Sequence, residues 1–128
     1  MDLDAKIRNA INVYIDSFGK KDVDAIMELF TDNAWIEDPI GTPRKETAES
    51  IREFYTSSVA MDISLSLESE PRVVGNEAAF AFCATVNLGE DELKISPIDV
   101  MTFDDEGRIT SMRAFFSEAN QVILKKQS

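Results

Sequence analysis

The chain has 128 residues, of which 44% are hydrophobic, carries a formal net charge of −11 and contains no histidine. This length and composition predict one folded domain spanning residues 1–128, and the negative charge argues against nucleic acids and acidic membrane surfaces as partners. The lack of histidine excludes histidine-based catalytic triads and most catalytic zinc sites, so any catalysis has to use carboxylates, tyrosines, lysines or arginines.

The N-terminal half is predicted to be mostly helical. Apolar residues recur at spacings of three and four over about residues 3–18, which is typical of an amphipathic helix. Asp22 can cap a second, shorter helix with Phe30 on its apolar face. A short strand is expected from Ala34 to Asp38, and a third helix over about residues 46–58.

The C-terminal half is predicted to consist of strands joined by turns. Apolar residues alternate with other residues over about 63–67, 78–88, 95–103 and 109–116. The acidic residues 90–92 are expected to form a solvated loop. The element order predicts an α+β fold, in which a curved, mostly antiparallel sheet wraps around three N-terminal helices as a cone with an internal apolar pocket.

An acidic residue lies in the middle of an apolar strand face. Asp99 shares its predicted face with Ile95, Met101 and Phe103. A carboxylate there would suffer a large desolvation penalty, so Asp99 should stay protonated or have a strong partner. A neutral carboxylic acid can donate a hydrogen bond, which makes Asp99 a candidate for stabilising an oxyanion. The structural alternative is an acid in a salt bridge, for example with Arg113 on the next strand.

Two further side chains could act together with Asp99. Tyr14 lies on the apolar face of the first helix, and Asp38 ends the short strand on the face shared by Ala34 and Ile36. An ionised Asp38 would abstract a proton next to a carbonyl, while neutral Asp99 and Tyr14 would hold the enolate oxygen that develops. Both residues also have simpler interpretations: Tyr14 as a core residue with a satisfied hydroxyl, and Asp38 as a turn residue before a proline.

Five segments resemble a known family, with the spacing between them preserved. They cover residues 35–41, 50–55, 76–82, 97–101 and 111–116. In these segments the chain resembles the bacterial ketosteroid isomerases (steroid delta-isomerases) of the nuclear transport factor 2-like fold, in which one acid is the base and another is kept neutral by its apolar site. The resemblance implies that a 3-oxo-delta-5-steroid is converted to its conjugated delta-4 isomer through a dienolate, with no metal or organic cofactor.

The resemblance also assigns roles to individual residues. Asp38 matches the general base, and Tyr14 and Asp99 match the oxyanion hole. Tyr55 matches a tyrosine that hydrogen-bonds the oxyanion-hole tyrosine, although its pattern alone also fits a core residue. Positions of apolar, substrate-binding pocket residues are matched by Phe54, Phe82, Met112 and Phe116.

The expected partners are a small apolar substrate, a steroid, and a second copy of the chain, because family members are usually homodimers that pair through their sheets. Trp35 replaces a smaller residue common in the family and is expected to point away from Asp38, into packing or an interface. The lone Cys83 cannot form an internal disulfide, no apolar run is long enough to span a bilayer and the N-terminus has no signal-peptide pattern. These features favour a cytoplasmic protein.

Two other functions remain open on the sequence. The first is a different enzyme on the same fold, because relatives include dehydratases, epoxide hydrolases and polyketide cyclases. Known dehydratases of this kind rely on histidine, and the groups that would position a hydrolytic water are not identifiable in the sequence. The second is a non-catalytic domain that binds an apolar ligand or mediates assembly, which would need neither Asp38 nor Tyr14.

Overall fold

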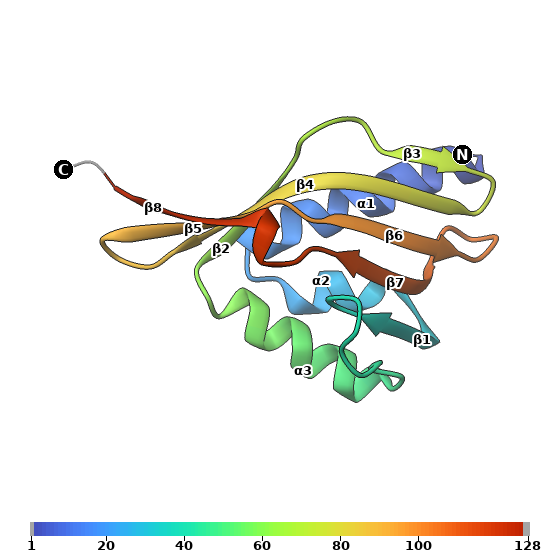
Figure 1. Ribbon diagram of the computed structural model, residues 1–128. Coiled ribbons are helices and arrows are strands. Elements are labelled where there is room, and N and C mark those ends of the chain that lie inside the picture. The colour runs from blue at the N-terminus through green and yellow to red at the C-terminus, as the bar shows by residue number, and fades with distance from the viewer. Residues whose placement is uncertain (1, 127–128) are drawn as a thin grey trace.

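The computed structural model describes residues 2–126 (Figure 1). The helices and the first strand are α1 (Leu3–Gly19), α2 (Val23–Glu28), β1 (Phe30–Glu37) and α3 (Ala48–Val59). They are followed by β2 (Ile63–Leu67), β3 (Arg72–Val74), β4 (Glu77–Asn87), β5 (Asp91–Ile95), β6 (Ile98–Phe103), β7 (Ile109–Phe115), a short 3-10 turn (Glu118–Asn120) and β8 (Gln121–Lys125). Within this described part, none of the helices combines the length and the apolar character needed to cross a membrane.

The two longer helices begin at side chains that satisfy free backbone N–H groups. The Asp2 carboxylate accepts a hydrogen bond from the backbone N–H of Ala5 at 2.8 Å, at the start of α1. Thr47 and Ser50 form a capping box at the start of α3. These caps fix where each helix begins, and hence which of its residues face the sheet.

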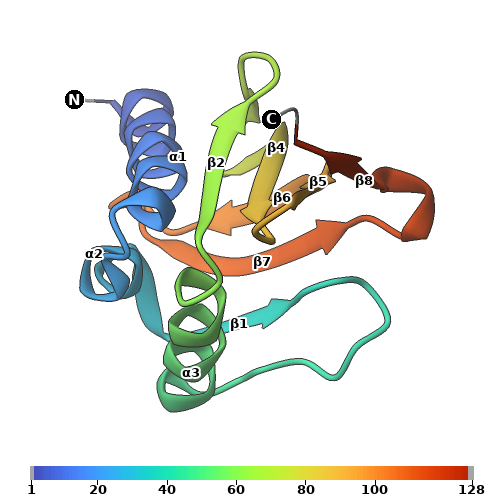
Figure 2. The same ribbon diagram turned by 90° about the vertical axis from the view of Figure 1, so that its left-hand side faces the viewer.

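The strands form one curved sheet with the order β1-β7-β6-β4-β5-β8, and β2 and β3 also pair with β4. The first half of β4 pairs with β6 and β3, whereas its second half, from Phe82 onward, pairs with β2 and β5. β4 therefore belongs to two differently oriented parts of the sheet. Figure 2 shows the helices along one face of the curved sheet. The predicted α+β fold is confirmed, and the parallel pair β1–β7 is the exception to its antiparallel pairing.

Several element boundaries differ from the sequence prediction, and β1 spans Phe30–Glu37 where a strand from Ala34 to Asp38 is expected. Phe30 begins β1 and does not continue α2, because α2 ends at Glu28 and the chain turns at Leu29. The strand predicted over residues 95–103 is split into β5 and β6. Pro97 lies at the break, because it lacks the N–H that a central strand needs.

The far end of the sheet was also predicted incompletely. The expected loop at residues 90–92 contributes Asp91 and Glu92 to β5, and β3 and β8 were not predicted. Every residue of β8 is exposed, so the strand lacks the alternation of buried and exposed positions that marks a half-buried strand. β8 is defined by its pairing with β5, with which it forms a ribbon that extends beyond the helices (Figure 1).

Candidate active site

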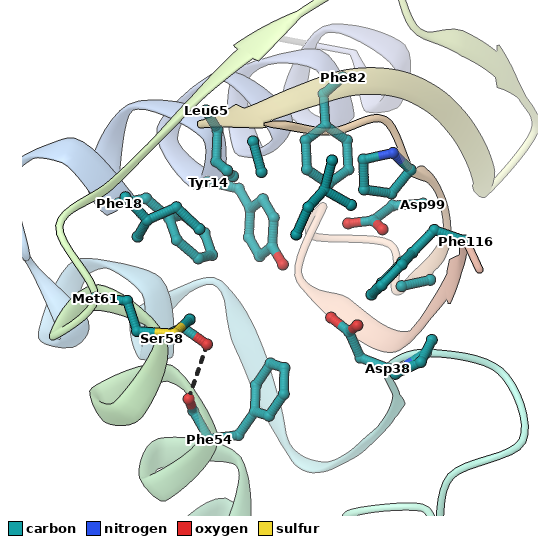
Figure 3. A pocket seen from close by; sticks show the side chains of 16 residues that line it. Tyr14, Phe18, Asp38, Phe54, Ser58, Met61, Leu65, Phe82, Asp99 and Phe116 are labelled. Carbon is teal, nitrogen blue, oxygen red and sulfur yellow. Dashed lines mark hydrogen bonds between the residues drawn. The ribbon is translucent and has the colours of Figure 1, made fainter. Parts of the chain in front are cut away.

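A cavity of about 250 Å³ lies between α1, α3 and the concave face of the sheet. Its wall is mostly apolar, with Phe18, Phe54, Leu65, Phe82, Ile95 and Phe116 among the lining side chains. Among the described residues, four polar side chains line it: Tyr14, Asp38, Ser58 and Asp99. The Ser58 hydroxyl already donates to the backbone carbonyl of Phe54 at 3.0 Å. The other three point toward a common space (Figure 3).

Asp99 lies in β6 between Phe80 of β4 and Ala114 of β7, and it is only 1% exposed. Both of its carboxyl oxygens are buried and have no hydrogen-bond partner within residues 2–126. Burial raises the pKa of Asp99 well above its usual range, and the nearby charge of Asp38 raises it further. This direction favours the protonated form, and the carboxyl group is among the residues that line the cavity.

The alternative partner for this acid, Arg113, lies elsewhere. The Nε atom of Arg113 is 3.7 Å from a carboxylate oxygen of Glu37, and its guanidinium lies near the Phe115 ring. Residues 113 and 114 are neighbours in β7, so their side chains point to opposite faces of the sheet. Ala114 lines the cavity beside Asp99, so Arg113 is directed to the outer face.

Tyr14 projects from α1 into an aromatic cluster and is 2% exposed. Its ring makes edge-on contacts with Phe18, Tyr55 and Phe80. The Tyr14 and Tyr55 hydroxyls are 3.0 Å apart and share one hydrogen bond. Burial raises the pKa of both phenols well above the ordinary value, so both stay neutral and can donate. If Tyr55 donates to Tyr14, the Tyr14 proton is free for a ligand in the cavity.

Asp38 follows β1 directly and is half-buried at the opposite side of the cavity. The Asp38–Pro39 peptide bond is cis, and the N–H of Ile40 donates to the backbone carbonyl of Ala114 at 2.9 Å. Burial raises the pKa of Asp38 from 3.8 to about 6, and the positive charge of Lys45 opposes this rise. A pKa of about 6 favours the ionised form of Asp38 at pH 7.

The structure brings together most of the residues singled out in the sequence. Phe54, Phe82 and Phe116 line the cavity with the three polar groups, and Tyr55 lies directly behind Tyr14. Met112 does not reach the cavity wall. It is fully buried and pairs with Met101 in the neighbouring strand, so its assignment as a pocket residue is corrected to a core residue. The position two residues later, Ala114, lines the cavity in its place.

Several lining residues were not identified from the sequence as site residues. Phe18 follows Tyr14 by four residues on the buried face of α1, so its position could have been read from helical spacing. Met61 and Ile63 lie where the chain leaves α3 and enters β2, and Pro97 lies at the break between β5 and β6. Ile63 begins the alternation predicted over residues 63–67, so its direction could have been read from strand spacing. No periodic pattern marks Met61 or Pro97, because each lies just outside a helix or strand.

Comparisons with known proteins agree with this architecture. Residues 11–112 match the SnoaL-like domain family. The chain is 36% identical over 121 residues to the Steroid Delta-isomerase of Nocardioides simplex, covering 94% of this chain and 98% of that protein. It also resembles the solved structure of the epoxide hydrolase/cyclase-like enzyme SalBIII, which is described for pyran ring formation in polyether salinomycin. That resemblance has a TM-score of 0.85 and 31% identity, over 92% of this chain and 95% of that one.

The family match spans most of the chain, and both relatives align over nearly their whole length. The helices and the curved sheet described above are the architecture that these proteins share. The chain therefore belongs to the SnoaL-like (nuclear transport factor 2-like) family.

Proposed function

We propose that this protein is an isomerase that converts 3-oxo-delta-5-steroids to conjugated delta-4 products, with Asp38 as the proton carrier and Tyr14 and Asp99 as the oxyanion donors. The proposal is supported by the steroid delta-isomerase relative and by the three polar groups that face one apolar cavity. The apolar wall suits a flat, apolar substrate, and it disfavours charge on Asp99.

The reaction consists of two proton transfers through one carboxylate. Ionised Asp38 removes a proton from the carbon between the carbonyl group and the double bond, and the electrons move onto the carbonyl oxygen as a dienolate. Tyr14 and Asp99 donate hydrogen bonds to that oxygen while its negative charge develops. Asp38 then returns the proton to the far carbon of the conjugated system, which restores the carbonyl and leaves the enzyme unchanged.

The observation that carries the proposal is the pair of unpartnered Asp99 oxygens. A buried acid without a protein partner is costly, and such groups in folded proteins usually have a reason. A ligand oxygen at the end of the cavity would supply the missing partner. The Tyr14 hydroxyl, held by Tyr55, points into the same space (Figure 3). An ordinary apolar-ligand site would need no second acid on the opposite side.

The direct test is to mix the purified protein with a 3-oxo-delta-5-steroid and to follow ultraviolet absorbance, because the conjugated enone absorbs and the substrate does not. We expect rapid growth of the enone signal. Asp38→Asn should slow turnover by about 10²–10⁴-fold, the usual contribution of positioned proton transfer. Steroid binding by that variant, measured by equilibrium dialysis, should persist. Full activity in Asp38→Asn would refute its role as the base.

A second candidate reaction is favoured by the likeness to the epoxide hydrolase/cyclase-like enzyme SalBIII. A neutral Asp99 could protonate an epoxide oxygen while Asp38 takes the proton of an attacking hydroxyl within the same substrate, which closes a ring. A hydroxy-epoxide substrate without a ketone distinguishes the two reactions. Ring closure by the wild-type protein, in the absence of any steroid isomerisation, would favour the cyclase.

A further inference from the structure

Asp38 and Asp99 face the same cavity, so the position of one proton decides which of the two acids is ionised. Asp99 is buried and Asp38 is half-buried, and the negative charge of Asp38 itself disfavours ionisation of Asp99. Two interacting carboxyl groups in one apolar space bind a proton more tightly than either alone, and the more polar surroundings decide which one ionises. Among the described lining residues of this cavity none is basic, so the deciding cation has to lie outside its wall.

The loop after Asp38 brings Lys45 back beside β1, the strand that Asp38 follows. Lys45 pairs with Ile36 of β1 as an isolated antiparallel bridge, with two backbone hydrogen bonds of 2.9 Å, one in each direction. Residues directly opposite each other in such a pair carry their side chains on the same face, and diagonal neighbours two residues away are still within reach of long side chains. Asp38 is two residues beyond Ile36, so it is the diagonal neighbour of Lys45.

The side chain of Lys45 continues over the edge of the cavity. Its Nζ atom lies 5.1 Å from the centre of the Phe54 ring, which lines the cavity. This cation–π contact holds the ammonium on the side of the site where Asp38 lies. The adjacent Arg44 takes the opposite direction: its guanidinium stacks on Trp35 at 3.8 Å and lies 4.0 Å from Glu37, away from the cavity.

We propose that Lys45 is a positioning residue for the proposed base, whose ammonium keeps Asp38 ionised so that the proton shared by the two facing acids rests on Asp99. This inference rests on the proposed function for its catalytic consequence. Across the cavity from Asp38 lie Asp99 from β6 and Tyr14 from α1, with Tyr55 from α3 behind Tyr14. Burial raises the pKa of all three groups and so favours their neutral forms. Lys45 is thus the one cation in the described surroundings that favours the Asp38 carboxylate.

The test compares Lys45→Met, which keeps the aliphatic stem over Phe54, with Lys45→Arg, which keeps the charge. Arg44→Met is the matched control, because it removes an equal charge from the next position of the same loop on the opposite side. The readout is kcat/KM against pH from 5 to 8.5. In Lys45→Met we expect the acid limb to move to higher pH, so that kcat/KM falls about three- to tenfold at pH 5 and is unchanged at pH 8. In Lys45→Arg and Arg44→Met, kcat/KM should fall at low pH over the same pH range as in the wild-type protein.

An equal loss at every pH in Lys45→Met would indicate a merely structural lysine, and an unmoved limb would refute the inference. A matching shift in Arg44→Met would assign the effect to net charge alone, which also refutes it. Titration of the ¹³C-labelled Asp38 carboxyl by NMR separates this inference from the proposed function, because it needs no turnover. If the steroid is not isomerised but the Asp38 titration moves upward in Lys45→Met, the function fails and the role of Lys45 stands.

Discussion

Asp38 and Asp99 lie on the two sides of β7 and open into the same cavity: Asp38 follows β1, Asp99 lies in β6, and both strands flank β7. Ala114 is the residue between them, because it pairs with Asp99 and accepts a hydrogen bond from the N–H of Ile40. Its small side chain leaves open the space across which the two carboxyl groups face each other.

Enlarging that position should therefore block the site. Ala114 is 1% exposed, so Ala114→Leu inserts three carbons between the acids. We expect a loss of about 1–3 kcal/mol in the free energy of unfolding and a much larger loss of isomerase activity. Urea unfolding and the enone assay measure the two effects. Ala78→Leu is a control, because Ala78 is 3% exposed but does not line the cavity. An Ala114→Leu protein with wild-type turnover would place the reaction elsewhere.

Loss of the buried acid should slow the reaction without preventing folding. Removal of one oxyanion donor typically reduces kcat by about 10²–10³-fold. We expect the reduction of kcat in Asp99→Ala to lie in this range and to be smaller than the reduction caused by loss of the base. Stability should change little or increase, because both carboxyl oxygens lack partners in the described structure. The measurements are kcat and the urea midpoint. A variant with lowered stability and unchanged kcat would identify Asp99 as structural.

Tyr14 and Tyr55 share one hydrogen bond, which a substitution at either residue removes. Tyr14→Phe and Tyr55→Phe both break the bond of 3.0 Å, so each should lower the free energy of unfolding by about 1 kcal/mol. Only Tyr14 lines the cavity, so Tyr14→Phe should reduce kcat far more than Tyr55→Phe. Equal kcat values in the two variants would show that the Tyr14 hydroxyl does not contact the developing oxyanion.

The pH dependence follows from the direction of the Asp38 shift. Because the pKa of Asp38 in the folded protein is about 6, kcat/KM should rise with pH up to about pH 6 and then level off. The free energy of unfolding should decrease over the pH range in which kcat/KM rises. Between pH 4 and 6 the folded protein holds a proton that the unfolded chain has released, so this contribution to stability is lost as the pH rises through 6.

The matched measurement for this effect uses Asp38→Asn, which cannot titrate. Relative to that variant, the wild-type protein should lose stability between pH 5 and pH 7.5 in urea unfolding. Titrating groups distant from Asp38 are common to both proteins, so their contributions cancel, and the remaining difference reports Asp38 together with the coupled Asp99. A constant difference between wild type and variant across this range would contradict the raised pKa.

The homodimer stays a prediction, and the outer face of the sheet offers a way to test it. Ile98 and Phe115 pair across β6 and β7, and they are 47% and 42% exposed on the face away from the helices. If copies pair through their sheets, Ile98→Asp should weaken the dimer, because it places a charge in the interface. Sedimentation equilibrium measures this, with Val74→Asp as the control at the exposed position in β3. An unchanged association constant in Ile98→Asp would place the interface elsewhere.

Much of the fold could be predicted because its elements have strong periodic patterns. The buried face of α1 repeats every three to four residues, and β4 alternates buried and partly buried positions along most of its length. β8 could not be predicted, because an exposed edge strand is determined by its partner β5 and not by its own pattern. The apolar residues on both sides of Pro97 are typical of one continuous strand, so the break there follows from the proline and not from the alternation.

The sequence by itself determined that Tyr14 and Asp99 face the interior and that Asp38 lies where a strand gives way to a turn, because helical spacing, strand alternation and the following proline mark these positions. Only the tertiary structure decided that the three groups open into one cavity, that Met112 lies in the core while Ala114 lines the wall, and that Lys45 returns beside Asp38. These relations depend on strand order and on loop geometry. Contacts between segments distant in the sequence arise from packing, which no local pattern encodes.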